Sequence, residues 1–130
     1  ICFMLWIEKR RFFSVFMLIL IGTEIFYISS IPGSKPIGGF GWIPLIYHFS
    51  IFFLFSFFVF FFIKGKEEKK SHHAIFALFL SLIYAISDEF HQSFVPFRTP
   101  SFGDIIIDLA GISFALLISI FISNRNLSEH

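Results

Sequence analysis

The chain has 130 residues, of which 56% are hydrophobic and 15% are charged, and its formal net charge is +1. Soluble domains average about 45–50% apolar and about 25% charged residues, so this composition excludes an ordinary soluble protein. No basic face exists to neutralise phosphates, which excludes a nucleic-acid partner, and the length fits a single domain over residues 1–130.

Four apolar runs approach the roughly 20 residues that a helix needs to cross a bilayer. They lack the alternating pattern of barrel strands, so all four are predicted to be helices. The third run is the shortest, and its polar end is the hardest boundary to place. The predicted fold class is an all-α membrane protein, a bundle of four transmembrane helices over about 12–30, 42–63, 74–90 and 104–123.

The first run follows basic residues and shares that feature with a secretory signal. It is long, however, and no small-residue cleavage site follows it. Pro32 and Gly33, which come directly after two serines, are typical of a turn. We therefore expect this run to be retained as a span.

Eight of the ten Lys and Arg residues lie on one side of this topology: before the first span, between the second and third, and after the fourth. The other side carries Lys35 and Arg98. Because cytoplasmic loops carry the excess of Lys and Arg, both termini and the Lys64–Lys70 loop are expected to face the cytoplasm.

Nearly all ionisable residues within the spans lie toward the ends that this orientation places outside. A charged group at the bilayer centre costs roughly 3 kcal/mol or more, so polar residues there indicate a function. Glu24 and His48 lie in the outer parts of the first two spans, and the segment from Ser87 to Gly111 connects the last two. Their common depth predicts one polar pocket that opens outward.

The end of the third span carries two acids and two further polar side chains. Asp88 precedes His91 by three residues and Gln92 by four, so these three side chains share one helix face, and Glu89 adjoins them. This face is expected to line the pocket.

The start of the fourth span carries Asp104, Asp108 and Gly111 at i, i+4 and i+7, which is again one stripe. Ser101 is a suitable N-cap, and Asp104 suits the positive end of a helix whether or not it has another role. Asp108 lies one turn deeper and indicates a functional or buried polar network. Gly111 permits close approach of a neighbouring helix.

Arg98 is the natural counter-ion in the connecting loop. It either snorkels to water, grips a lipid phosphate or carboxylate, or pairs with one of the acids Asp88, Glu89 and Asp104. Glu24 is expected to meet Arg98, His48 or water, or to be protonated. For His48, a hydrogen-bonded structural role is favoured over a role as ligand or base.

Several of these side chains offer oxygen or imidazole groups to a metal. No compact His-x-x-x-His or Glu-x-x-His spacing indicates a particular ion, so we expect no metal site and no cofactor. No Gly-x-Ser-x-Gly elbow occurs and Cys2 has no partner, which argues against a nucleophilic site.

The polar segment resembles the signature of the VanZ-like membrane protein family. That signature has the outline Asp-Glu-x-x-Gln, a short Pro-containing loop with an Arg, and then Asp-x-x-x-Asn-x-x-Gly. The matching positions here are Asp88, Glu89, Gln92, Pro96, Arg98, Asp104 and Gly111. Asp108 departs from the pattern, because the family usually has Asn there; the extra acid either changes the charge of the site or is held protonated by burial.

Two further features extend the resemblance over essentially the whole chain. The sequence FYISSIPG, from Phe26 to Gly33, is similar to the Ser-Ser-x-Pro exit from the family's first helix. His48 stands where the family often has a histidine opening its second helix. The resemblance implies a small multi-pass protein of the prokaryotic plasma membrane, in a family whose namesake is linked to low-level teicoplanin resistance.

Three functions fit these observations. The favoured one is binding of an anionic lipid or amphiphilic envelope ligand at the outer face, without catalysis. The alternatives are a membrane enzyme that acts on a lipid-linked substrate with Asp88 or Glu89 as general base, and a structural or assembly protein whose polar cluster only locks the hairpin. A transport role would require an oligomer, which the sequence leaves open. The expected ligand-binding residues are Asp88, Glu89, Gln92, Arg98, Asp104 and Asp108, supported by Glu24, His48, His91 and Gly111.

Overall fold

The computed structural model describes residues 11–33, 41–64 and 70–128. Within these ranges the chain forms four α-helices and no strand, which confirms the predicted all-helical class. Each helix is long and apolar enough to cross a membrane. The helices are α2 (Arg11–Ser30), α3 (Trp42–Lys64), α4 (Lys70–Gln92) and α5 (Phe102–Ser128).

The first two helices agree with the predicted spans within about a residue at each end, but the last two are longer than predicted. The third is not the shortest: α4 has 23 residues, against 20 in α2. It begins at Lys70 and ends at Gln92, and α5 continues to Ser128. Hydropathy marks only the apolar part of a helix, whereas backbone hydrogen bonding continues through polar turns beyond it.

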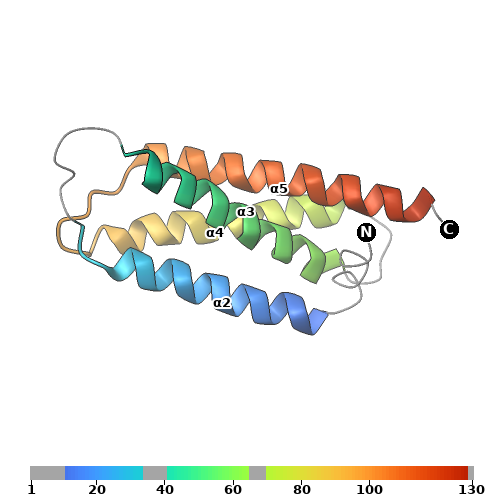
Figure 1. Ribbon diagram of the computed structural model, residues 1–130, viewed down its shortest axis with the longest axis horizontal. Helices are drawn as coiled ribbons and strands as arrows, with labels where there is room; N and C mark the ends of the chain where they lie inside the picture. The colour runs from blue at the N-terminus through green and yellow to red at the C-terminus, as the bar shows by residue number, and fades with distance from the viewer. Residues whose placement is uncertain (1–10, 34–40, 65–69, 129–130) are drawn as a thin grey trace.

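The four helices run up and down alternately, so that their ends gather at two opposite ends of the bundle (Figure 1). One end holds the start of α2, the end of α3, the start of α4 and the end of α5. The other end, here called the polar end, holds Ser30, Trp42, Gln92 and Phe102. All residues expected to form the site lie near this polar end. Each belongs either to the half of its helix that is closer to the polar end or to the α4–α5 connection.

The surface of the bundle is mostly large apolar side chains, whereas the interior combines large apolar residues such as Phe52 and Phe60 with many small ones. Large apolar side chains cover much of the outside, as with Phe16 and Leu117, which are 60% and 66% exposed. Small side chains fill many of the helix contacts, and the fully buried ones are Ser14, Ser56, Ala77, Ser81, Ala85, Ala115, Ser119 and Ser123. Membrane helices pack in this way, because lipid tails receive large apolar groups while small residues let backbones approach.

Helix α3 makes its most extensive contact with α5, and Gly111 lies within this contact, against the backbone of Phe49. A Cβ atom at Gly111 would lie 2.4 Å from the carbonyl oxygen of Phe49. The absence of a side chain is therefore what permits this approach, as the sequence predicted. Asp108 lies one helical turn before Gly111, and His48 directly precedes Phe49. The contact at Gly111 therefore places the Asp108 and His48 side chains at the same height along the bundle.

The α4–α5 connection is fastened to the end of α2. The Gly33 amide donates a hydrogen bond to the Pro96 carbonyl over 3.2 Å, and a Cβ at Gly33 would lie 2.5 Å from the Phe97 carbonyl oxygen. Phe97 has a positive φ of 60°, which turns the chain at this point. Ser101 then caps α5 as predicted, since its Oγ accepts a hydrogen bond from the Gly103 amide at 3.2 Å.

Candidate functional site

The polar end of the bundle holds a group of buried polar side chains that includes the buried acids of the described residues. Six of them, from all four helices, are at most 8% exposed: Ser29, His48, Asp88, Glu89, Gln92 and Asp108. Five of these six were candidates from sequence. Ser29 was not, although it lies in the segment FYISSIPG that carried part of the resemblance. These five residues, which hydropathy placed at a similar depth in the membrane, thus lie together at one end of the fold.

The first pair in the site joins α3 to α5. His48 Nδ1 lies 2.9 Å from Asp108 Oδ1, and the Asp108 side chain is fully buried. The Oδ2 atom of Asp108 has no hydrogen-bond partner among the described residues. Asp108 therefore belongs to a buried polar network, one of its two expected roles, and His48 is hydrogen-bonded as expected.

A second group joins α2 to α4 around Asp88. The Ser29 hydroxyl donates a hydrogen bond to Asp88 Oδ1, and the Gln92 side-chain amide donates to Asp88 Oδ2 over 3.0 Å. Both carboxylate oxygens are thus occupied. The helical spacing of four residues placed Asp88 and Gln92 together, whereas the contact with Ser29 depends on the packing of two helices.

Arg98 forms no ion pair with an acid in the part of the chain that the structure describes. Its Nε donates to the Ile31 carbonyl at 3.0 Å and its Nη2 to the Ile28 carbonyl at 2.8 Å. A longer bond of 3.4 Å joins Nη1 to Gln92 Oε1. Since the last carbonyls of a helix lack intrahelical donors, Arg98 caps the C-terminal end of α2.

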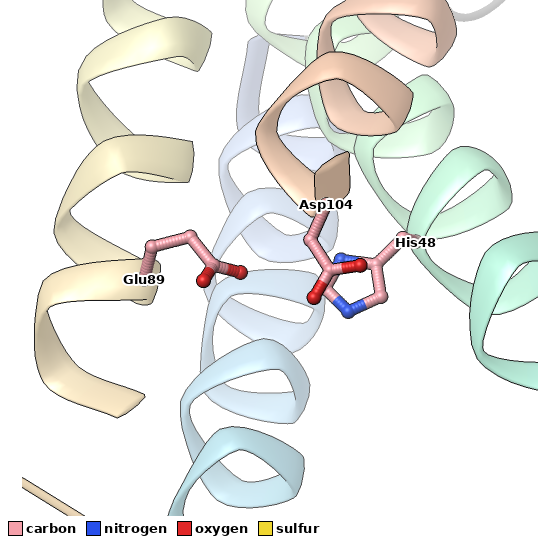
Figure 2. Close-up of side chains that lie close together, drawn as sticks. All are labelled: His48, Glu89 and Asp104. Carbon is pink, nitrogen blue, oxygen red and sulfur yellow. The ribbon is translucent and has the colours of Figure 1, made fainter. Parts of the chain in front are cut away.

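Glu89 connects the end of α4 to the start of α5. Its Oε2 accepts a hydrogen bond from the Ser101 amide at 3.0 Å, while the buried Oε1 has no partner within the described ranges. Figure 2 shows Glu89, Asp104 and His48 extending toward one another from three different helices. One potential ligand atom from each of these residues lies within 4.8 Å of the others.

Two of the expected supporting residues lie at the margin of the site. The Glu24 side chain is exposed on α2 and forms no hydrogen bond with Arg98 or His48. His91 Nε2 lies 3.0 Å from the Ser30 hydroxyl oxygen, and its ring stacks on Phe26 with 4.6 Å between ring centroids. Although His91 shares a helix face with Asp88, it thus contacts the outer flank of α2.

A cavity of about 270 Å³ lies between α2, α3, α4 and the α4–α5 connection. Half of its lining residues are apolar: Ile25, Ile28, Ile43, Pro44, Ile51 and Phe52. The other half are polar: Ser29, Tyr47, His48, Asp88, Gln92 and Arg98. The buried Tyr47 hydroxyl has no hydrogen-bond partner among the described residues. Tyr47 was not among the residues expected from the sequence, because no spacing relates it to the acids.

The family model described as VanZ/LLP1 matches residues 5–123, which is nearly the whole chain. The chain belongs to this family. No curated protein and no solved structure shows significant similarity to it. Membership in the VanZ/LLP1 family, together with four helices of spanning length, identifies an integral membrane protein.

The segment that carried the resemblance to VanZ-like proteins is also the segment that builds the site. Asp88 and Gln92 form the α2–α4 group, Arg98 caps α2, and Gly111 sets the α3–α5 contact. Asp108, where the VanZ-like pattern usually has Asn, still provides an oxygen that binds the His48 ring nitrogen. An Asn side chain offers the same acceptor, so the pairing with His48 does not itself require the acid.

Proposed function

We propose that this protein binds an anionic, lipid-linked amphiphile in the cavity at the polar end of the bundle. The observation that carries the proposal is the cavity's mixed lining, with isoleucines beside a guanidinium group and an unpartnered tyrosine hydroxyl. Ligand pockets combine a mainly apolar wall with a few placed polar groups in this way. The acyl or isoprenoid part would contact the isoleucines, and the head group would contact Arg98 and Tyr47.

The hydrogen bonds of Arg98 support an anionic head group. A guanidinium group has five N–H donors, and its three recorded hydrogen bonds leave two of them available. A phosphate or carboxylate fits these donors and matches the positive charge. The buried Tyr47 hydroxyl supplies a further donor, which would otherwise lack a partner at a cost of about 1–3 kcal/mol.

The hydrogen bonds of Asp88 and Glu89 bear on the catalytic alternative. Each oxygen of Asp88 accepts one hydrogen bond and keeps a second lone pair, so these bonds fix the carboxylate without excluding a general base, and the lipid assay below decides between binding and catalysis. Glu89 has a free oxygen but is not among the residues that line the cavity. The contacts of Arg98 with α2 and of Glu89 with Ser101 also support a structural role, in which the same polar residues hold the helix ends together.

To test ligand binding, the full chain can be purified in mild detergent and examined by native mass spectrometry, with identification of the bound lipid. We expect about one lipid per chain in the natural protein. Tyr47→Phe removes only the unpartnered hydroxyl, and Ile28→Trp fills the cavity, so both variants should retain at least ten-fold less lipid. Ile19→Trp is the matched control, because Ile19 lies on the same helix and is 65% exposed.

The same lipid content in Ile28→Trp and Ile19→Trp would contradict the proposal. A bound lipid that Tyr47→Phe leaves unchanged would show that the hydroxyl is not a contact. Conversion of added lipid to a new mass would replace binding by the enzymatic alternative. If the natural protein carries no lipid and only Arg98→Ala fails to accumulate, the structural role accounts for the site.

We also propose that the polar end faces the outside of a prokaryotic plasma membrane, because most Lys and Arg residues flank the opposite end. In a Cys2→Ser background, Thr99→Cys should react with an impermeant maleimide on intact cells. His72→Cys, at the start of α4, should react only after lysis. The reverse pattern would invert the topology. A link to teicoplanin resistance, which the VanZ-like resemblance implies, depends on this orientation because that drug acts outside the cell.

A further inference from the structure

Three potential metal ligands from three helices meet next to the cavity. His48 comes from the start of α3, Glu89 from the end of α4 and Asp104 from the first turn of α5. One ligand atom from each lies within 4.8 Å of the other two, so a small inward movement of the side chains would bring the three donors to the roughly 3–4 Å that separates ligands around one Zn²⁺ or Mn²⁺ (Figure 2). His48 and Glu89 are buried and Asp104 is half-buried, so this is not a group of solvated surface acids.

Glu89 provides independent support for a ligand at this place. Its side chain is only 4% exposed, and its Oε1 has no hydrogen-bond partner in the described part of the chain. The carboxylate points toward Asp104 and His48 (Figure 2). Neither Glu89 nor Asp104 is paired with a Lys or Arg among the described residues. A buried carboxylate of this kind is either protonated or needs a positive partner, because burial of an unpaired charge is strongly unfavourable, and a cation at this place would be that partner.

Asp108 orients the His48 ring so that it can bind a metal. Its Oδ1 holds Nδ1 of the ring at 2.9 Å, which leaves Nε2 as the ring nitrogen without a hydrogen bond to any described residue. Histidines that bind metals commonly donate their other N–H to a carboxylate, which fixes the ring and raises its basicity. An aspartate at position 108 serves this purpose better than the asparagine that is usual in VanZ-like proteins, because it carries the charge.

We propose that His48, Glu89 and Asp104 bind one divalent cation and that Asp108 is the positioning residue for His48. One imidazole and two carboxylates suit Zn²⁺ or Mn²⁺ better than Ca²⁺, which takes six to eight oxygen ligands. Three protein ligands leave a coordination position open. Because His48 also lines the cavity, the cation would lie beside it. The metal site does not depend on the proposed amphiphile, because all three of its protein ligands belong to the chain itself.

The experiment is a metal titration of the full chain, purified in detergent through an affinity tag without histidines and stripped with a chelator. Equilibrium dialysis with Zn²⁺, and separately with Mn²⁺, measures the metal bound per chain. We expect saturation near one ion for at least one of the two metals. Glu89→Gln and Asp104→Asn should weaken binding at least ten-fold, and both keep an oxygen, so Glu89→Gln still accepts the Ser101 hydrogen bond. Asp108→Asn should weaken it by about 10–100-fold through His48.

Two matched controls lie outside the three ligands. Glu24→Gln removes an acid and His91→Ala a histidine, and both should leave the metal affinity unchanged within two-fold. Circular dichroism and size-exclusion profiles identify any variant that has lost its fold. No saturable binding of either ion by the natural protein overturns the proposal, as does binding that Glu89→Gln leaves intact or that His91→Ala abolishes. Because the titration uses metal alone, failure of the lipid proposal leaves its outcome unaffected.

Discussion

Replacement of Asp108 by alanine is expected to lower the free energy of unfolding by about 3 kcal/mol, the low end of the range for breaking a buried pair. The carboxylate is fully buried and bonds the His48 ring nitrogen at 2.9 Å, so its removal leaves that nitrogen without a partner between α3 and α5. The cavity left by the lost side chain adds to the effect. Unfolding in mixed micelles with increasing dodecyl sulfate measures the difference.

Asp108→Asn is the matched variant for this prediction. The amide oxygen occupies the place of Oδ1 and can accept a hydrogen bond from His48, so the loss should be less than about 1 kcal/mol. Equal destabilisation by Ala and Asn would show that the negative charge, rather than the acceptor, stabilises the pair. In a double-mutant cycle, His48→Ala and Asp108→Ala together should cost less than the sum of the single changes. Additivity would contradict a direct interaction.

Replacement of Gly111 by alanine is expected to destabilise the bundle by about 2 kcal/mol, within the usual range for overpacking. The new Cβ would lie 2.4 Å from the Phe49 carbonyl oxygen, a backbone atom that cannot move without α3. The better helix propensity of alanine offsets up to about 1 kcal/mol of the strain. Gly111→Leu should prevent accumulation of the folded protein altogether.

Gly22→Ala controls for the change of residue type. A Cβ at Gly22 would lie 3.5 Å from the Tyr84 hydroxyl oxygen, which is an ordinary contact, and the hydrogen bond from Tyr84 to the Gly22 carbonyl remains. This variant should be as stable as the natural protein or slightly more so. Thermal scanning of the two alanine variants by fluorescence-detected size exclusion provides the comparison. Equal melting temperatures would show that α3 and α5 adjust to the added methyl group.

The fold was largely predictable because lipid imposes a strong constraint on the backbone. A run of about 20 apolar residues in a bilayer must satisfy its hydrogen bonds internally, which requires a helix. The contact between Asp88 and Gln92 within α4 was equally predictable, because the two residues are one helical turn apart. The polar turns at Lys70–His73 were missed because they are helical without being apolar.

Most side-chain contacts between helices could not be predicted from the sequence. The expectations for Arg98 included an ion pair with a nearby acid, but its hydrogen bonds go to the Ile31 and Ile28 carbonyls at the end of α2. No linear spacing reveals that His48, Glu89 and Asp104 converge, because each comes from a different helix. Glu24 has the right depth but lies on an exposed face of α2. Depth in the membrane is encoded in hydropathy, whereas the direction a side chain takes around the bundle depends on packing.

The cap that Arg98 places on α2 also bears on the order of events during synthesis. Ile28 and Arg98 are 70 residues apart, so α2 is made long before Arg98 can donate to the Ile28 carbonyl, which also accepts a hydrogen bond from the nearby Ile31 amide. The α4–α5 connection must be made and packed against the end of α2 before that bond can form. Closure of this end is therefore expected to come late in synthesis, after α4 and the α4–α5 connection have been made.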